Sequence, residues 1–215
     1  MKKINYGKIL DDKIQELKTS GHKPSLLLHA CCAPCSSHTL TVLYNYFDII
    51  LYFFNPNISH EEEYLYRCGE LKRLVSEMNM NINIIEESYD PAPFYELARG
   101  LENLPERGER CRKCISFRLE KTAEKAKSIG ADMFTTTLTI SPHKDCQFIN
   151  QCGGEISKIY GIEYLYSDFK KHDGYKHSVE LSKKYNLYRQ DYCGCVYSKL
   201  TKNNISAAAD GGDKI

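Results

Sequence analysis

The stretch SLLLHACCAPCSSHTL, residues 25–40, decides the fold. It begins with a short apolar run typical of a buried strand and continues as a helical pattern with serines near its start. Between the two halves stand three cysteines, Cys31, Cys32 and Cys35. The segment therefore predicts a strand, a turn and a helix, with thiols placed where the strand ends.

The same alternation of strand and helix continues along the chain. A typical helical pattern is SHEEEYLYRCGELKRLVSEMN, residues 59–79. Further strand patterns lie in DIILYFFNP (48–56), INIIEES (82–88), MFTTTLTIS (133–141) and IEYLYSDF (162–169). This rhythm predicts an α/β fold, in which a parallel sheet carries helices on both faces. Ligands of such sheets gather at the carboxyl ends of the strands.

Length and composition set the expected domain organisation. A chain of 215 residues with 42% hydrophobic residues predicts a single α/β domain over residues 1–200. Residues 90–128 depart from the alternation and look helical, so we expect an insert that leans over the strand ends. Residues 201–215 are small and polar and predict a disordered tail. The formal net charge of +1 neither favours nor excludes a nucleic-acid partner.

Cysteine is abundant in this chain. The N-terminal residues show no secretory apolar segment, and no apolar run approaches the length of a membrane span. We therefore expect a cytoplasmic protein, in which a framework of disulfides is disfavoured. Ten cysteines then indicate metal binding or redox chemistry.

One candidate metal-binding motif lies in ERCRKC, which contains Cys111 and Cys114. Two thiolates at this spacing near a helix start can hold zinc or part of an iron–sulfur cluster, or can act as a redox pair. Neighbouring basic residues favour the thiolate form. The alternative is a solvated basic helix with incidental cysteines.

The adjacent pair Cys31 and Cys32 is more unusual, because neighbours on a regular strand point to opposite faces. Both can serve one centre only where the backbone turns, and Ala33-Pro34 supplies such a turn. Structural zinc sites use spaced pairs. We therefore favour one four-thiolate cluster built from Cys31, Cys32, Cys111 and Cys114. Buried structural cysteines are the alternative, and Cys35 is either a ligand of a second metal or a spectator.

A third motif is Cys193-Gly194-Cys195. A disulfide between residues two apart closes a tight ring that glycine permits, and a strained disulfide is easily reduced. The pair therefore fits an electron relay, with two further metal ligands as the alternative. Three other cysteines, Cys68, Cys146 and Cys152, have no predicted role.

Five motifs occur in an order that resembles the QueH-type epoxyqueuosine reductases over roughly residues 24–200. They are HACCAPCSS, YFFNPNISHEEEYLYR, ERCRKCISFRLEKTAEKA, TTTLTISPHKD and DYCGCVYS. The resemblance implies a HUP-like fold, a [4Fe-4S] cluster and an additional mononuclear iron. It also implies reduction of epoxyqueuosine to queuosine at the tRNA anticodon wobble position, without cobalamin and with an unknown electron donor.

The resemblance also implies roles for individual cysteines. By motif, Cys31, Cys32, Cys111 and Cys114 correspond to the cluster ligands, and Cys193 and Cys195 to the redox-active pair. Some relatives carry aspartate at the position of Cys35, which leaves the ligands of the additional iron open.

Removing an epoxide oxygen requires two electrons, two protons and a site for the departing oxygen. The candidate proton donors are His29, His143, Asp145, Asp191 and Tyr192, and we take Asp145 forward because it follows the fourth strand. Candidate base-stacking residues are Tyr64, Tyr66, Tyr89, Tyr175, Tyr192 and Tyr197. Candidate phosphate-binding residues are Arg67, Arg107, Arg110, Arg112, Lys113, Lys144 and Lys176.

Two other functions remain open on the sequence. An ATP-dependent tRNA-modifying enzyme of the same fold would need a glycine-rich phosphate loop after the first strand, where this chain has HACCAPCSS. A zinc and nucleic-acid-binding module without catalysis would leave Cys35, Cys193 and Cys195 without a role.

Overall fold

The structure, a computed structural model, describes residues 3–200. Its centre is a five-stranded sheet of order β3-β2-β1-β4-β5 in which all neighbouring strands are parallel. The strands are β1 (Ser25–His29), β2 (Asp48–Phe53), β3 (Asn83–Glu86), β4 (Met133–Thr136) and β5 (Glu163–Tyr164). The predicted α/β fold is confirmed, although β5 is shorter than the strand pattern at 162–169 suggested.

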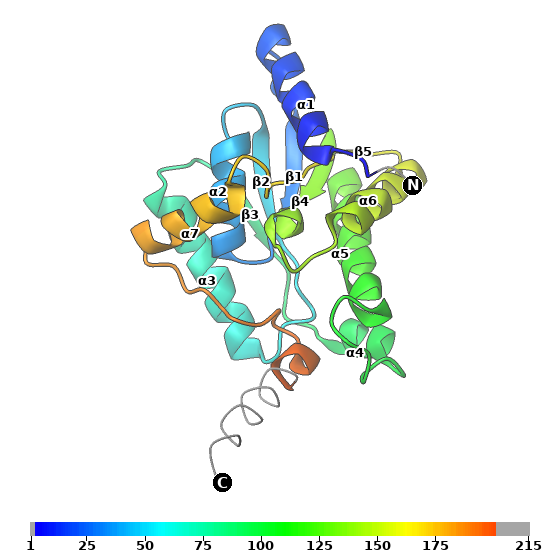
Figure 1. Cartoon of the computed structure of the whole chain (residues 1–215). Helices are drawn as coiled ribbons and strands as arrows, with labels where there is room; N and C mark the ends of the chain where they lie inside the picture. Colours follow the sequence, from blue (N-terminus) through cyan, green and yellow to red (C-terminus); the bar gives the residue numbers. More distant parts are fainter. Residues whose placement is uncertain (1–2, 201–215) are drawn as a thin grey trace.

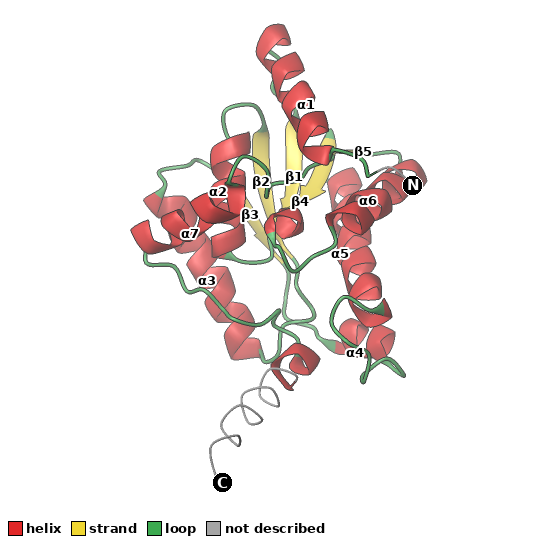
Figure 2. Cartoon of the chain, in the orientation of Figure 1, coloured by secondary structure: helices red, strands yellow, loops and turns green. Residues whose placement is uncertain are grey.

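Helices cover both faces of the sheet (Figures 1 and 2). On one side lie α2 (Ala33–Leu43), α3 (Glu61–Glu77) and α7 (Gly174–Lys184), where α2 packs against both α3 and α7. On the other side lie α5 (Glu109–Ser128) and α6 (Cys146–Tyr160), which pack against each other. The remaining helices are α1 (Tyr6–Ser20), the short α4 (Ala92–Ala98) and the 3-10 helix η1 (Thr137–Ile140).

The apolar run of β1 explains why the sheet is covered on both faces. Leu26 and Leu28 belong to the core shared with α2 and α3, whereas Leu27 belongs to the core shared with α5 and α6. Side chains alternate across a strand, so a strand buried on both faces must be apolar at every position. Each such side chain contributes about 1.5–3 kcal/mol when it is buried.

The segment predicted as a helical insert forms α4 and α5 with a loop between them. The first turns of α5 carry the CxxC motif. Its later turns pack on the sheet through Leu119, Ala123 and Ala126, which are fully buried. The segment thus serves both as a cover near the strand ends and as the crossover from β3 to β4. The expected tail, residues 201–215, lies outside the described residues.

None of the helices within residues 3–200 has the length and apolar character needed to cross a membrane.

Candidate metal and redox site

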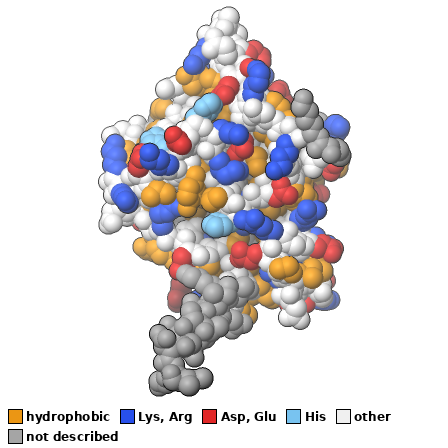
Figure 3. All heavy atoms as spheres, in the orientation of Figure 1, with side chains coloured by type: hydrophobic (Ala, Val, Ile, Leu, Met, Phe, Trp, Pro, Cys, Tyr) orange, Lys and Arg blue, Asp and Glu red, His pale blue; other side chains and the backbone are white. Residues whose placement is uncertain are grey.

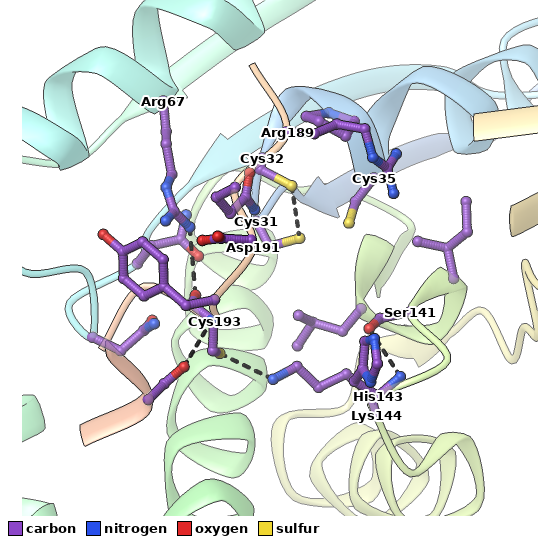
Figure 4. Close-up of a pocket in the computed structure, with 18 of the residues that line it drawn as sticks. Cys31, Cys32, Cys35, Arg67, Ser141, His143, Lys144, Arg189, Asp191 and Cys193 are labelled. Carbon is purple, nitrogen blue, oxygen red and sulfur yellow. Dashed lines mark hydrogen bonds between the residues drawn. The ribbon is translucent and has the colours of Figure 1, made fainter. Parts of the chain in front are cut away.

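A cavity of about 560 Å³ opens at the carboxyl ends of the strands. Its walls come from the turn after β1, the loop after β2, the loop after η1 and the segment 189–193 (Figure 4). These segments are distant in the sequence and meet because parallel strands end at one edge of the sheet. The cavity therefore lies where the fold class places a ligand site.

Three cysteines on this cavity form a compact group, which we call the thiol triad: Cys31, Cys32 and Cys35. Their sulfur atoms all lie within 4.8 Å of one another, in an arrangement that could hold a metal ion. The Cys31 and Cys32 sulfurs are 3.7 Å apart. Thiolates are soft ligands that select metals such as iron and zinc. The first predicted cysteine motif is therefore one cluster of potential ligands.

Local backbone geometry explains how adjacent cysteines reach the same point. Strand β1 ends at His29, and Cys32 is extended (φ −174°, ψ 164°) as the N-cap of α2. Pro34 lies in the first turn of the helix, where its missing N–H costs nothing. Hydrogen bonds from Cys31 and Cys35 lower the pKa of Cys32, and the helix N-terminus also favours a thiolate.

The other two cysteine motifs meet in a second, smaller pocket, whose thiols we call the thiol quartet: Cys111, Cys114, Cys193 and Cys195. This pocket shares four lining residues with the large cavity, namely Asn57, Arg118, Lys144 and Cys193. The structure thus brings the CxxC and CGC motifs together, with the thiol triad on the adjoining cavity. One cluster held by Cys31, Cys32, Cys111 and Cys114 stays a prediction.

Cys193 and Cys195 are both free thiols, and their surroundings differ. Lys144 Nζ lies 3.0 Å from Cys193 Sγ (Figure 4). Burial opposes ionisation of Cys193, but the charges of Lys144 and Arg118 outweigh it and lower its pKa. Burial and the neighbouring Cys193 raise the pKa of Cys195 to about 12. The pair therefore combines a thiolate-prone sulfur with a proton-retaining one.

The structure separates the candidate proton donors into two sets. His143, Asp191 and Tyr192 line the cavity, as does Glu106, which the sequence analysis missed. Asp145 is the N-cap of α6, where its carboxylate accepts a hydrogen bond from the Phe148 backbone N–H. Asp145 is not among the described residues that line the cavity. Its role as a proton donor therefore stays a prediction.

His29, the last residue of β1, is fully buried. Its ring nitrogens contact Thr136 Oγ1 at 2.8 Å and the Phe54 backbone oxygen at 3.1 Å. Burial lowers its pKa to about 3, so the ring is neutral at physiological pH. These contacts link the end of β1 to β4 and to the residue directly after β2, which indicates a structural role for His29.

Two candidate phosphate-binding residues turn out to be internal. Arg67 is 2% exposed and forms an ion pair with Glu63. Arg110 is 1% exposed and donates to the backbone oxygens of Leu101, Glu102 and Leu104. Both are therefore engaged within the protein, although Arg67 still lines the cavity.

Candidate stacking residues also separate by position. Tyr175 and Tyr192 line the cavity, and the guanidinium of Arg189 lies 5.6 Å from the centre of the Tyr175 ring. Tyr64 is buried in the core and donates to the Glu87 backbone oxygen. The ring of Tyr66 packs outside the cavity against Tyr188.

Sequence reasoning also missed Arg118, which is 3% exposed and lines both the cavity and the small pocket. A signal for it exists in CISFR, because Arg118 follows Cys114 by four residues and therefore lies one helical turn away on the same face.

Comparison with known proteins identifies the family. The sequence model of the family described as "Epoxyqueuosine reductase QueH" matches residues 26–201. A protein of this description from Streptococcus pyogenes serotype M1 is 45% identical over 200 residues, covering 91% of this chain and 78% of that protein. One from Staphylococcus epidermidis is 43% identical over 204 residues, covering 92% and 86%.

A solved structure supports the fold. A predicted subunit of a tRNA methyltransferase from Methanocaldococcus jannaschii aligns with a TM-score of 0.50 at 10% identity and covers 74% of each chain. The predicted HUP-like arrangement of a parallel sheet with helices on both faces agrees with this likeness. The match over residues 26–201 includes the thiol triad and the thiol quartet. The chain therefore belongs to the QueH family of epoxyqueuosine reductases.

Proposed function

We propose that this chain reduces epoxyqueuosine to queuosine in the tRNA anticodon, as an oxidoreductase independent of cobalamin. A [4Fe-4S] cluster held by Cys31, Cys32, Cys111 and Cys114 and the dithiol of Cys193 and Cys195 would carry the electrons. Family membership supports this activity. The observation that carries it is the position of Cys193, which lines both the cavity beside the thiol triad and the pocket of the thiol quartet.

The residues present fit a thiolate-bound metal centre. The three sulfurs of the triad lie within 4.8 Å of one another, and Cys32 and Cys114 are buried. Cations next to the thiols, Lys144 and Arg118, offset the negative charge that several thiolates would bring. Cys35 would be free to hold the additional iron. When bound, such a centre supplies single-electron transfer and a Lewis acid for the departing oxygen.

The dithiol supplies the two electrons and two protons that the reduction requires. When Cys193 and Cys195 form a disulfide, they release two electrons and two protons. Both C–O bonds of the epoxide break, a carbon–carbon double bond forms and the oxygen leaves as water. Lys144 Nζ, 3.0 Å from Cys193 Sγ in the dithiol form, would stabilise the thiolate that starts this step. An external reductant then returns the disulfide to the dithiol.

The cavity is large enough for one modified nucleoside, because ligand sites commonly measure about 300–1,000 Å³. Tyr175 at its edge can stack on a base that has left the anticodon stack. Figure 3 shows basic side chains interspersed with acidic ones over the face in view. We therefore place the phosphate contacts on a few residues, Arg189, which lines the cavity, and the exposed Lys176, which follows the cavity residue Tyr175. A tRNA substrate locates the activity in the cytoplasm.

Anaerobic turnover tests this function. The protein, reconstituted with iron and sulfide, is incubated with tRNA that contains epoxyqueuosine and with dithionite. The tRNA is then digested and its nucleosides are analysed by mass spectrometry. We expect queuosine, lighter than its precursor by one oxygen atom. Unchanged epoxyqueuosine, together with tight stoichiometric zinc and no visible absorption, would instead favour the non-catalytic zinc module.

A further inference from the structure

Arg118 is a buried cation whose hydrogen bonds reach only neutral groups. Its side chain donates to Asn55 Oδ1 at 3.2 Å and to the Cys114 backbone oxygen at 3.4 Å. Within residues 3–200, Arg118 forms no ion pair with a carboxylate, although Arg67 on the same cavity has Glu63. A buried charge without a partner costs several kcal/mol, so proteins retain one only where an anion offsets it.

The groups around Arg118 identify that anion. The side chains that most favour its charge are Cys114, Cys193, Cys31 and Cys111, drawn from both the triad and the quartet. Arg118 also lines both the large cavity and the small pocket. Its guanidinium therefore lies beside both thiol groups, where thiolates or a centre that they bind can balance its charge.

A second cation repeats this arrangement. Lys144 contacts Cys193 Sγ and has no carboxylate partner within the described part of the chain. Glu106 also lines the cavity and its charge opposes ionisation of Cys193, but within residues 3–200 it forms no ion pair with Arg118 or Lys144. The site thus holds two positive charges in place for an anionic occupant.

We infer that Arg118 is a positioning residue that stabilises the anionic thiolate-bound centre and raises its reduction potential. This inference rests on the proposed function, because it requires that the thiols bind an iron–sulfur cluster. Reduction adds one negative charge to the cluster. A nearby cation in a site shielded from water lowers the free energy of the reduced form more than that of the oxidised form.

A matched set of variants tests the inference. Arg118→Met removes the charge and keeps an unbranched apolar side chain, whereas Arg118→Lys keeps the charge. Lys121→Met removes an exposed cation one turn further along α5, where water screens it. Each protein is reconstituted with iron and sulfide, its iron content is measured, and its midpoint potential is determined by a redox titration followed by EPR.

We expect Arg118→Met to disfavour reduction by about tenfold, which corresponds to about 59 mV for one electron. Arg118→Lys should retain most of the wild-type potential, and Lys121→Met should leave it unchanged. An Arg118→Met protein with full iron and sulfide and an unaltered potential would overturn the inference. Wild-type protein that takes up no cluster would overturn the proposed cofactor as well, so the two failures are distinguishable.

If Arg118→Met does not retain a cluster, the inference is tested by urea unfolding of the metal-free protein. In the metal-free protein the bound centre is absent, and so is the negative charge of that centre that Arg118 would offset. Replacing a buried unpaired charge by an apolar group is then neutral or stabilising. We expect Arg118→Met to unfold at the same or a higher urea concentration than wild type. A clear loss of stability would instead show that Arg118 acts through its two hydrogen bonds, and would overturn the inference.

Discussion

Replacing Lys144 by methionine should make Cys193 much less reactive. In the structure, the Lys144 ammonium lies 3.0 Å from Cys193 Sγ and is the first favourable influence on the thiolate. The variant removes this charge and leaves a side chain of similar length. Burial, which raises the pKa of Cys193, would then be opposed mainly by Arg118.

The size of the effect follows from the hydrogen bond. Hydrogen bonds to charged groups contribute about 1.5–3 kcal/mol. About 1.4 kcal/mol changes an equilibrium tenfold. The ratio of thiolate to thiol at Cys193 should therefore fall by about a factor of ten or more at a given pH. The rate of alkylation depends on the thiolate and should fall with it.

The assay measures iodoacetamide alkylation of the metal-free, reduced protein, quantified by mass spectrometry on the peptide that contains Cys193. In Lys144→Met the onset of alkylation should move to higher pH, because the neutral thiol is now favoured. Lys113→Met serves as the control, since Lys113 is an exposed lysine on α5 that pairs with Glu109. Equal alkylation rates in wild type and Lys144→Met would refute the assigned role of Lys144.

Three further predictions concern the dithiol, the core and a buried histidine. Cys193→Ser should abolish turnover but keep the iron content of wild type, and loss of iron in this variant would contradict its role as a relay. Leu119→Ala should lower the free energy of unfolding by about 2–5 kcal/mol in urea denaturation, because Leu119 is fully buried. Burial lowers the pKa of His29 from 6.5 to about 3. Between these two pH values His29 is therefore protonated in the unfolded chain and neutral in the folded protein. Wild-type stability should therefore fall as pH drops from 6.5 toward 3, and His29→Gln should show a weaker dependence between about pH 7 and 5; parallel curves would contradict this reading.

Most of the fold could be predicted because its signals are local. The strand and helix patterns alternate along the chain, and β1 is apolar at successive positions since both of its faces are buried. The length of β5 could not be predicted in this way. Its pattern continues to residue 169, yet only Glu163 and Tyr164 pair with β4. Pairing at the sheet edge depends on the neighbouring strand rather than on propensity.

The cysteine motifs could also be recognised from the sequence, because the cysteines of each motif lie within a few residues of one another. Their grouping was not: the structure joins Cys111 and Cys114 with Cys193 and Cys195 around one pocket. That contact joins segments far apart in the sequence and depends on how the C-terminal segment crosses the strand ends.

The sequence also did not reveal which charged side chains lie at the site. Asp145 follows β4 as expected, but a short acidic side chain before a helix is also a favoured N-cap, and the structure uses it so. The spacing of Arg118 from Cys114 indicates only that they share a helix face, and the packing of α5 shows that Arg118 also lies near Cys193 and Cys31.

The central claim is that thiols from distant parts of the chain hold one iron–sulfur centre. Iron and acid-labile sulfide analysis of anaerobically reconstituted Cys31→Ser and Cys114→Ser tests it most directly, with Cys68→Ser, a buried core cysteine, as the control. We predict that either site variant loses the whole cluster and its visible absorption, while the control keeps both. Wild-type iron and sulfide in Cys31→Ser or Cys114→Ser would contradict a single shared centre.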